Sequence, residues 1–385
     1  MRFLERLRGA KRSCTVQTAP GPAPTGLLPE YRPLQPREAA LYDAMREAVP
    51  VIDAALDKIV RLTGGFRVLC SDASRQKALD AFVGGVRVGA CSRGLHQFMN
   101  VYLDCLLTYG NAVGEIVPSS GGDEIFALYN ARLGDVRVRQ GASPLEVTFL
   151  AADGAGDFVP VRRPELVLFT PLSPPAGELL GVPLLRSLPF VTGILLKVFS
   201  STGVNFERIA NLRYAVVYKP GASGLDKAYA QDIAKNIAQE WGEAMNAGKN
   251  GAVRDFVAVG DVEIKVIGAD NQMLDTQVPV RQMLEQIVAK LGIPPFMLGL
   301  HWSSTERMST QQADILTSEL ESYRTLLGGV IRRICDFFLH LSGWGCTSHV
   351  VWEDINLQDE VEAANARLLA AQARKLEREM EGEEV

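Results

Sequence analysis

The chain has 385 residues, of which 47% are hydrophobic and 22% are charged. This is an ordinary globular balance, and the length allows two or three domains with a sizeable core. The 40 Lys and Arg residues and the 45 Asp and Glu residues give a net charge of -5. Tight binding to nucleic acid depends on neutralising phosphates, so this acidic balance argues against a protein that grips DNA or RNA tightly.

The cysteines, the histidines and the start of the chain exclude further classes. The six cysteines include no C-x-x-C pair, and the four histidines form no metal-binding cluster, so we expect reduced thiols and no metal site. The N-terminus is basic but no hydrophobic stretch follows it, which argues against a signal peptide. The longest apolar run, Leu188 to Phe199, contains Lys197 and is too short to span a bilayer. These features predict a soluble protein made inside the cell.

Residues 1–36 are rich in Pro and Gly after the basic start, which is typical of a flexible arm. Helical spacing of apolar residues then predicts a helix from about Pro36 to the glycine pair that ends at Gly65. Pro50 is expected to kink this helix. The residues after it, Phe66 to Leu69, read as a strand.

A second helix is predicted at about 92–109, ending at Gly110. Short alternating runs separated by turn residues follow it and predict strands. These strands are Ala112–Val117, Ile125–Tyr129, Val136–Arg139, Leu145–Leu150, Phe158–Val161 and Glu165–Phe169. A helix followed by such a run of strands indicates an α+β domain.

The second half of the chain is mostly helical. A helix is expected from about Ser187 to Leu212, and a second ends near Leu291, with Pro279 at its start or at a kink. The first of them places five apolar residues on one side: Phe190, Ile194, Leu195, Val198 and Phe199. Between the two helices the pattern predicts a helix capped by Asp226 and three short strands. The strands are Tyr214–Tyr218, Val253–Val259 and Val262–Ile267.

The longest helix is predicted at about 310–342, with Ser309 and Gln312 in a capping box. Its apolar residues alternate at spacings of four and three, as in a heptad seam. They are Leu316, Leu320, Tyr323, Leu327, Val330, Ile334, Phe337 and Leu341. The pair Gly328-Gly329 interrupts the seam and is expected to allow a bend or a close helix contact. A last helix at about 357–380 leads into an acidic tail.

No motif for catalysis stands out. Gly242 to Lys249 approximates a phosphate-binding loop, but the first glycine is one residue too far away and Asn250 replaces the magnesium-binding Ser or Thr. The chain has no G-x-S-x-G, H-E-x-x-H or G-x-G-x-x-G sequence. We therefore expect no enzyme, no catalytic residue, no metal and no cofactor.

Several segments resemble, in the same order, the HK97-type phage portal family between about residues 37 and 342. They are Leu107-Thr108-Tyr109-Gly110-Asn111-Ala112, Leu180-Gly181-Val182-Pro183-Leu184-Leu185, Trp241 with Asn246-Ala247-Gly248-Lys249, Leu291-Gly292-Ile293-Pro294-Pro295-Phe296-Met297-Leu298-Gly299, and a polar loop leading into a helix with Gln311-Gln312. Each segment is short and weak by itself. Their shared order over most of the chain makes the resemblance specific.

The resemblance implies a portal fold, an α+β architecture with wing, stem, clip, tunnel loop and crown. By position, a flexible arm (1–36) precedes an α+β wing (37–186), a stem helix (187–212) and a small α/β clip (213–270). A second stem helix (271–299), a tunnel loop (300–309) and a wing-crossing helix with its connection (310–355) follow. A short helical crown with the acidic tail (356–385) ends the chain. Pro279 and the brevity of the last part depart from the family pattern.

The resemblance also implies a function without catalysis, in which twelve copies form a ring at one capsid vertex of the virion. Double-stranded DNA is packaged and ejected through the ring, and terminase and then head-tail adaptor proteins dock on the clip, beside the major capsid protein. The acidic composition then suits a channel in which DNA slides. The implied DNA-facing loop residues are His301, Trp302, Ser303, Ser304, Thr305, Glu306 and Arg307, with Lys290 on the stem; the clip docking candidates are Lys219, Lys249 and Arg254.

Two alternatives remain open from the sequence. One is another phage capsid or tail-adaptor protein that assembles without a DNA channel. The other is a nucleotide-dependent enzyme whose phosphate site is the poor match ending at Lys249. Exposed apolar helix faces are predicted to be either subunit contacts or ordinary packing within the chain.

Overall fold

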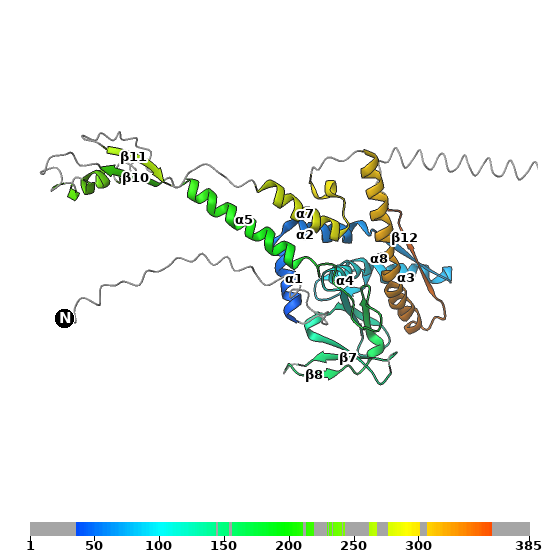
Figure 1. The fold of residues 1–385 in the computed structure, drawn as a ribbon. Helices are drawn as coiled ribbons and strands as arrows, with labels where there is room; N and C mark the ends of the chain where they lie inside the picture. Colours follow the sequence, from blue (N-terminus) through cyan, green and yellow to red (C-terminus); the bar gives the residue numbers. More distant parts are fainter. Residues whose placement is uncertain are drawn as a thin grey trace, which may run out of the picture.

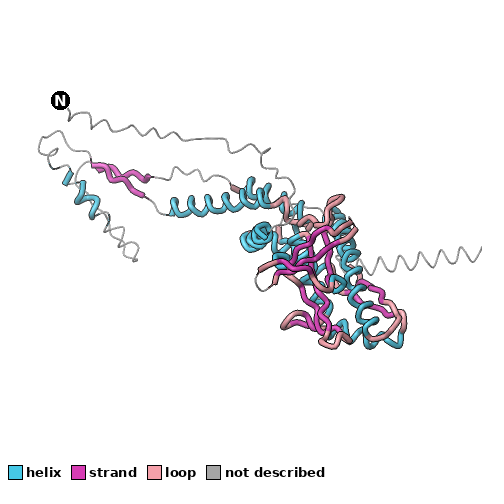
Figure 2. Tube along the Cα trace, turned by 90° about the horizontal axis from the view of Figure 1, so that it is seen from below, coloured by secondary structure: helices cyan, strands magenta, loops and turns pink. Residues whose placement is uncertain are grey.

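The computed structural model describes residues 36–143, 145–153, 156–210, 213–218, 229, 231–232, 234–240, 242, 262–267, 276–300 and 306–355. These residues form a body of helices and sheets from which one long helix extends (Figure 1). That helix, α5 (Pro189–Ala210), leads toward the antiparallel pair β10 (Arg213–Tyr218) and β11 (Val262–Ile267). The shorter helix α7 (Gln277–Leu291) lies beside the part of α5 nearer the body, as seen again in Figure 2.

The centre of the body is α4 (Leu95–Tyr109), whose buried residues face the core while His96, Gln97 and Asn100 lie on an exposed side. One side packs on a five-stranded sheet, and the other meets α1 (Pro36–Ala48), α2 (Pro50–Leu62) and α8 (Glu306–Leu341). The sheet has the order β3-β2-β5-β4-β9. Its strands are β3 (Ser92–Arg93), β2 (Arg87–Val88), β5 (Ile125–Asn130), β4 (Asn111–Pro118) and β9 (Val167–Pro171). The apolar residues of α4 cover the larger part of its surface, which explains why several elements pack around it.

The turn from α4 into β4 joins two of the family-like segments. Gly110 has a φ of 73°, and a Cβ atom there would lie 2.4 Å from the Pro183 nitrogen. The Asn111 side chain accepts a hydrogen bond of 2.9 Å from the Gly181 backbone N–H. The Leu172 N–H donates to the Gly110 carbonyl at 2.8 Å. The segments at 107–112 and 180–185 are therefore one packing unit in the folded chain.

A smaller three-stranded sheet lies against the far side of the five-stranded one. It has the order β6-β7-β8, formed by β6 (Val136–Gln140), β7 (Val147–Ala152) and β8 (Phe158–Pro160). Phe149 of β7 meets Phe169 of β9 edge to face, with ring centroids 5.9 Å apart. All the strands predicted between 112 and 169 are present, with ends shifted by a few residues; β9 begins only after the 3-10 turn η4 (Pro164–Leu166).

A second sheet joins distant parts of the chain. β1 (Phe66–Cys70) pairs antiparallel with β12 (Ser348–Trp352), with Phe66 opposite Trp352 and Cys70 opposite Ser348. Between β1 and α4, η2 (Ala73–Arg75) and α3 (Gln76–Gly85) pack beside β1 and α8. The strand at 66–69 was expected from the sequence, but its partner and α3 were not.

The first helix is not one kinked helix, as expected, but two. Val49 leaves helical geometry, with φ of −126° and ψ of 91°, and separates α1 from α2. The ring of Pro50 clashes with a helical conformation of the residue before it, so Val49 becomes extended and Pro50 starts α2. Pro279 acts in the same way at a helix start, because α7 begins late, at Gln277, with Pro279 in its first turn.

The long helix also begins elsewhere than predicted. α8 starts at Glu306, so Ser309 lies inside its first turn and the expected capping box at Ser309 and Gln312 is wrong. Glu, Arg and Met have good helix propensity, which favours this extra turn. The helix continues through Gly328-Gly329, and a Cβ atom added at Gly328 would lie 4.0 Å from the Trp352 indole nitrogen of β12. The expected seam from Leu316 to Ile334 is buried in the body.

Several expectations lie outside the described residues. They are the N-terminal arm up to residue 35, the strand Val253–Val259 and the last helix at about 357–380.

Candidate functional site

The stem helix α5 presents apolar residues to solvent on two opposite sides. Phe190 and Val204 stand fourteen positions apart with Lys197 midway between them, so all three share one face. Phe199 and Phe206 are seven apart on a second face, and Phe199 is nine positions from Phe190, about two and a half helical turns. We call these the Phe190 face and the Phe199 face.

The intrachain contacts of α5 leave most of both faces open. Leu195 and Thr192 are buried where the helix joins the body and α7. Phe190, by contrast, is 65% exposed, and Phe199 and Phe206 are each about half exposed, at 50% and 54%. Of the apolar side predicted from the sequence, Leu195 is therefore buried, whereas Phe190 and Phe199 are exposed.

The connection from α7 to α8 forms the base of the predicted tunnel loop. Gly292 and Gly299 have φ values of 69° and 74° and bracket the 3-10 turn η5 (Pro295–Leu298). Glycine adopts this left-handed geometry without strain, which lets the chain turn sharply at both points. The family-like Gly-Ile-Pro-Pro run thus follows directly on α7 and leads through η5 to the second turn at Gly299.

An apolar hollow of about 320 Å³ lies beside this connection, lined in part by Val288, Ile293, Pro294 and Ile315. Ile315 on α8 is 64% exposed, and Met308, one heptad earlier, is also exposed. The side-chain oxygen of Gln312 is buried there without a hydrogen-bond partner. The lining also includes the Glu285 carboxylate of α7.

Lys290 is the one predicted channel residue with a described side chain on the stem. It is exposed on the last turn of α7 and lines a small cavity with Leu316, Glu319 and Tyr323 of α8. Burial, together with the nearby Glu319 carboxylate, raises the pKa of Tyr323 to about 12. The structure places Lys290 at the junction of α7 with the body, not midway along the stem. Its role toward DNA stays a prediction.

The predicted tunnel loop is shorter than expected. Glu306 and Arg307 belong to the first turn of α8, where Arg307 is exposed. His301, Trp302, Ser303, Ser304 and Thr305 lie outside the described residues, as do the clip candidates Lys219, Lys249 and Arg254. Of the residues implied by the family pattern, only Lys290, Glu306 and Arg307 lie among the described residues.

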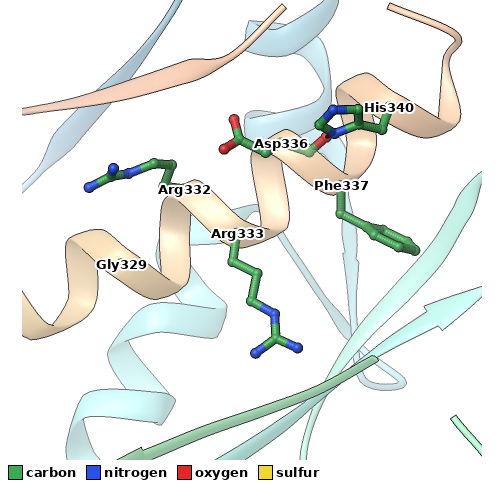
Figure 3. Close-up of a pocket in the computed structure, with 6 residues that line it drawn as sticks. All are labelled: Gly329, Arg332, Arg333, Asp336, Phe337 and His340. Carbon is green, nitrogen blue, oxygen red and sulfur yellow. Dashed lines mark hydrogen bonds between the residues drawn. The ribbon is translucent and has the colours of Figure 1, made fainter. Parts of the chain in front are cut away.

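A wide hollow of about 610 Å³ near the other end of α8 gathers the polar residues shown in Figure 3. Arg332 and Arg333 point in different directions there, and Arg333 donates to the Glu165 carbonyl at 2.7 Å. The Asp336 carboxylate accepts from the Ser348 N–H and hydroxyl, both at 2.7 Å. His340 contacts the Asp336 carbonyl of its own helix. These contacts fasten β12 and the turn η4 onto α8, and they form no convergent site.

The described part of the chain contains no group of three or more His, Cys, Asp and Glu side chains arranged to hold a metal ion. Within the same residues, none of the helices combines the length and apolar character needed to cross a bilayer.

Comparisons with known proteins identify solved structures of similar fold. No protein-family model matches the chain, and no curated protein matches it in sequence. Among solved structures, a chain from the neck of a native GTA particle, computed with C12 symmetry, is 17% identical with a TM-score of 0.62. The match covers 88% of this chain and 90% of the other. A chain from the virion of a native gene transfer agent (GTA) particle matches at 17% identity and a TM-score of 0.59, over 90% and 91% of the two chains.

A weaker match is an HK97 family phage portal protein from Corynebacterium diphtheriae, at 12% identity and a TM-score of 0.44, over 83% and 95% of the chains. The stronger matches show that the chain shares the fold of chains from the neck and the virion of GTA particles, and at this identity they establish the fold alone.

Proposed function

We propose that the chain is a subunit of a phage portal ring, the channel at a capsid vertex through which double-stranded DNA is packaged and ejected. The observation that carries the proposal is α5, which extends from the body with apolar residues on two opposite faces (Figure 1). A subunit in a ring touches one neighbour on each side through two different surfaces, which together close the circle. Two opposite open faces on one helix suit that arrangement.

The exposed apolar residues on the two faces of α5 favour a bound partner. Phe190, Val204, Phe199 and Phe206 are all exposed on one helix of the described chain. Monomeric soluble proteins rarely leave several large apolar side chains open on a single element, and such patches commonly mark interaction sites. Lys197, centred on the Phe190 face, would pair with an acidic group of the neighbour.

The fold likeness supports the same role. The similar chains come from the neck of GTA particles, in structures computed with C12 and C6 symmetry. A ring of twelve copies, virion location, terminase docking and contacts with the capsid protein and head-tail adaptor follow as parts of the proposal. The net charge of -5 suits a channel that does not hold DNA by phosphate contacts.

Negative-stain microscopy of the purified chain tests the proposal. We expect rings with a central hole. Monomers, or assemblies without a hole, would contradict the portal and favour another capsid or tail-adaptor protein.

The absence of an enzymatic activity is also proposed. The polar residues described above either hold elements of the body together or have no reactive neighbour; they include Glu319, Asp336 and His340. Most of the segment 242–250 lies outside the described residues. Calorimetry with ATP is expected to show no binding. Binding that is lost in Lys249→Ala would instead support a nucleotide-dependent enzyme.

A further inference from the structure

The two open faces of α5 differ in how they lie relative to α7. Thr192, Phe199 and Phe206 stand seven positions apart, so they share one side of the helix. Thr192 is buried where α5 meets α7 and the body, which places the Phe199 face on the side toward α7. Phe190 lies nine positions before Phe199, about half a turn round the helix. The Phe190 face therefore points away from α7.

The apolar hollow beside the connection from α7 to α8 lies on the other side of this helix pair. Met283 and Leu284 of α7 pack against the core to which Leu195 of α5 belongs. Glu285 and Ala289, four positions apart on nearly the opposite face of α7, line the hollow. The two helices together thus carry an exposed aromatic side chain on one side and an apolar hollow on the other.

Phe190 and the hollow also lie at the same level of the stem. α5 begins at Pro189 and α7 ends at Leu291, and both of these ends adjoin the body (Figure 1). Leu188 and Leu291 are buried in one core. Two surfaces on opposite sides and at one level suit a closed ring, because an offset along the axis would give an open helix of subunits.

Opposite charges stand at matching distances along the two helices. Lys197 is exposed, seven residues out from Phe190 along α5. Glu285 stands seven residues out from Gly292, the residue that ends α7 and also lines the hollow. Seven residues span about two turns, or roughly 10 Å, on each helix. Glu285 contacts Arg281 of its own helix at 2.9 Å, and such a half-exposed pair contributes little, which leaves the carboxylate open to a second cation.

We propose that the Phe190 ring of one copy inserts into the hollow between α7 and α8 of a second copy, with Lys197 beside the second copy's Glu285. The contact rests on the proposed function, and it names the two halves of one subunit interface in the ring.

The hollow has the size and the character for this guest. A cavity of about 150 Å³ accommodates a benzene molecule, so the hollow of about 320 Å³ has room for a phenyl ring. Phe190 and Ile315, both about two-thirds exposed in the single chain, would be covered together. The N–H groups in the first turn of a helix have no partner within it, so the start of α5 would bring donors toward the side-chain oxygen of Gln312, which lacks one.

The same docking joins the other open residues of the stem. Val204 stands fourteen residues out from Phe190, and it would reach the level of Phe199 and Phe206 on the second copy. The Phe190 face of one α5 then lies toward the Phe199 face of the next. Each copy uses both faces once, as a head-to-tail contact in a ring requires.

Cross-linking between two single variants tests the contact. Chains with Lys197→Cys are co-expressed with chains with Glu285→Cys, and the assembled protein is treated with a short bismaleimide. Both positions are at the rim, so the Phe190 ring and the hollow stay intact. We expect a covalent dimer on a denaturing gel, because each chain carries one engineered thiol. Each variant expressed alone sets the background from the native cysteines.

The matched control replaces Glu285→Cys by Leu145→Cys, at a 94% exposed turn far from the stem, and should give only that background. Rings in which Lys197→Cys and Glu285→Cys chains stay unlinked would overturn this contact and leave the ring standing. A chain that stays monomeric on microscopy contradicts the proposed function, and the contact with it. The two failures are therefore distinguishable.

An exchange of side-chain sizes tests the fit itself. Ala289→Phe fills the hollow from its exposed lining and should raise the protein concentration needed for half assembly by about tenfold, as loss of one apolar anchor does. Phe190→Ala should do the same. The double variant puts the ring on the other partner and should assemble better than either single variant, whereas losses that simply add would show that the two residues do not meet. Urea unfolding of the single chain should be unchanged, because both positions are exposed.

Discussion

At the scale of single residues, backbone geometry and buried charge decide how α4 is held. Gly110 turns the chain out of α4 with a φ of 73°, and the neighbouring backbone at Pro183 leaves no room for a Cβ atom. One residue before the end of α4, Thr108 receives a hydrogen bond from Arg46 of α1. The central helix thus depends on a glycine at its exit and on one arginine beside it.

Gly110→Ala should destabilise the chain by about 3 kcal/mol, because the left-handed backbone and the clash with residues 182–183 both oppose a Cβ atom. Gly122→Ala is the matched control. Gly122 has nearly the same φ, 75°, but a Cβ atom there would meet open space, so its cost should be about 1 kcal/mol. Urea unfolding measures both. Equal losses would mean that contact with the 182–183 segment is not tight.

Arg46 anchors a partly buried charge network. Its guanidinium contacts both oxygens of Asp104, at 2.8 and 2.9 Å, and one oxygen of Asp53 at 2.7 Å. Removing the cation in Arg46→Met leaves Asp104 partly buried without its partner, at an expected cost of about 2 kcal/mol. Asp53→Asn, at the more exposed end, should cost less than about 1 kcal/mol by the same unfolding assay.

The pH dependence of this network has a defined sign. Burial raises the pKa of the Asp104 carboxyl above its ordinary value, and the Arg46 charge partly opposes that rise. Without Arg46 the folded-state pKa of Asp104 rises further, so the folded state binds the proton more tightly than the unfolded state. Its contribution to stability then grows as pH falls through that raised pKa. The deficit of Arg46→Met relative to the parent chain should shrink from pH 7 toward pH 4, and a deficit that grows on acidification would contradict this account.

At the scale of elements, the helices and strands that could be predicted are those that local sequence patterns indicate. The strands from Ala112 to Phe169 and the helix α4 were recoverable because apolar spacing and turn residues are written locally. The pairing of β1 with β12 was not, because nothing near Phe66 indicates a partner almost 300 positions later. The break at Val49 was visible as Pro50, but the sequence alone did not distinguish a kink from an end.

The candidate site was predictable to the same extent. The helices α5 and α7 and the turn before residue 300 were predicted correctly, the turn because Gly292, Pro294 and Gly299 mark it. Which side of α5 stays open could not be read, because Phe190, Leu195 and Phe199 are equally apolar in sequence. Only their contacts with α7 and the body separate the buried residue from the exposed ones.

The open faces of α5 give the prediction at this scale. Phe190→Ser with Val204→Ser should abolish or strongly weaken ring assembly, because it removes the apolar contact on one side of each subunit. Stability of the isolated chain should change by less than about 1 kcal/mol, since both residues are exposed. Leu145→Ser, at a 94% exposed turn before β7, is the control and should assemble normally. Mass photometry reads the assembly state, and rings that persist in the double variant would place the subunit contact elsewhere.

At the scale of the whole molecule, the extended α5 and the body have separate tasks in the proposed ring. The apolar seam of α8 and the strand pair β1–β12 close the body within one chain. The faces of α5 and the hollow at Ile315 are left for contacts beyond it. Stability of the subunit and assembly of the ring should therefore respond to different substitutions.

The same separation should extend to the segment between η5 and α8. Because α8 begins at Glu306, a replacement that spares the helix must end at residue 305. Exchanging residues 301–305 for glycine and serine should leave unfolding and ring formation unchanged, since the flanking turns at Gly299 and the α8 start are kept. Particles assembled with this variant should retain or package less DNA than the parent. The same exchange at 141–145, the turn between β6 and β7, should leave DNA content unaltered. Measuring rings by microscopy and DNA by nuclease-protected yield separates the two effects: loss of rings in the 301–305 variant would show that this segment holds subunits together rather than facing DNA.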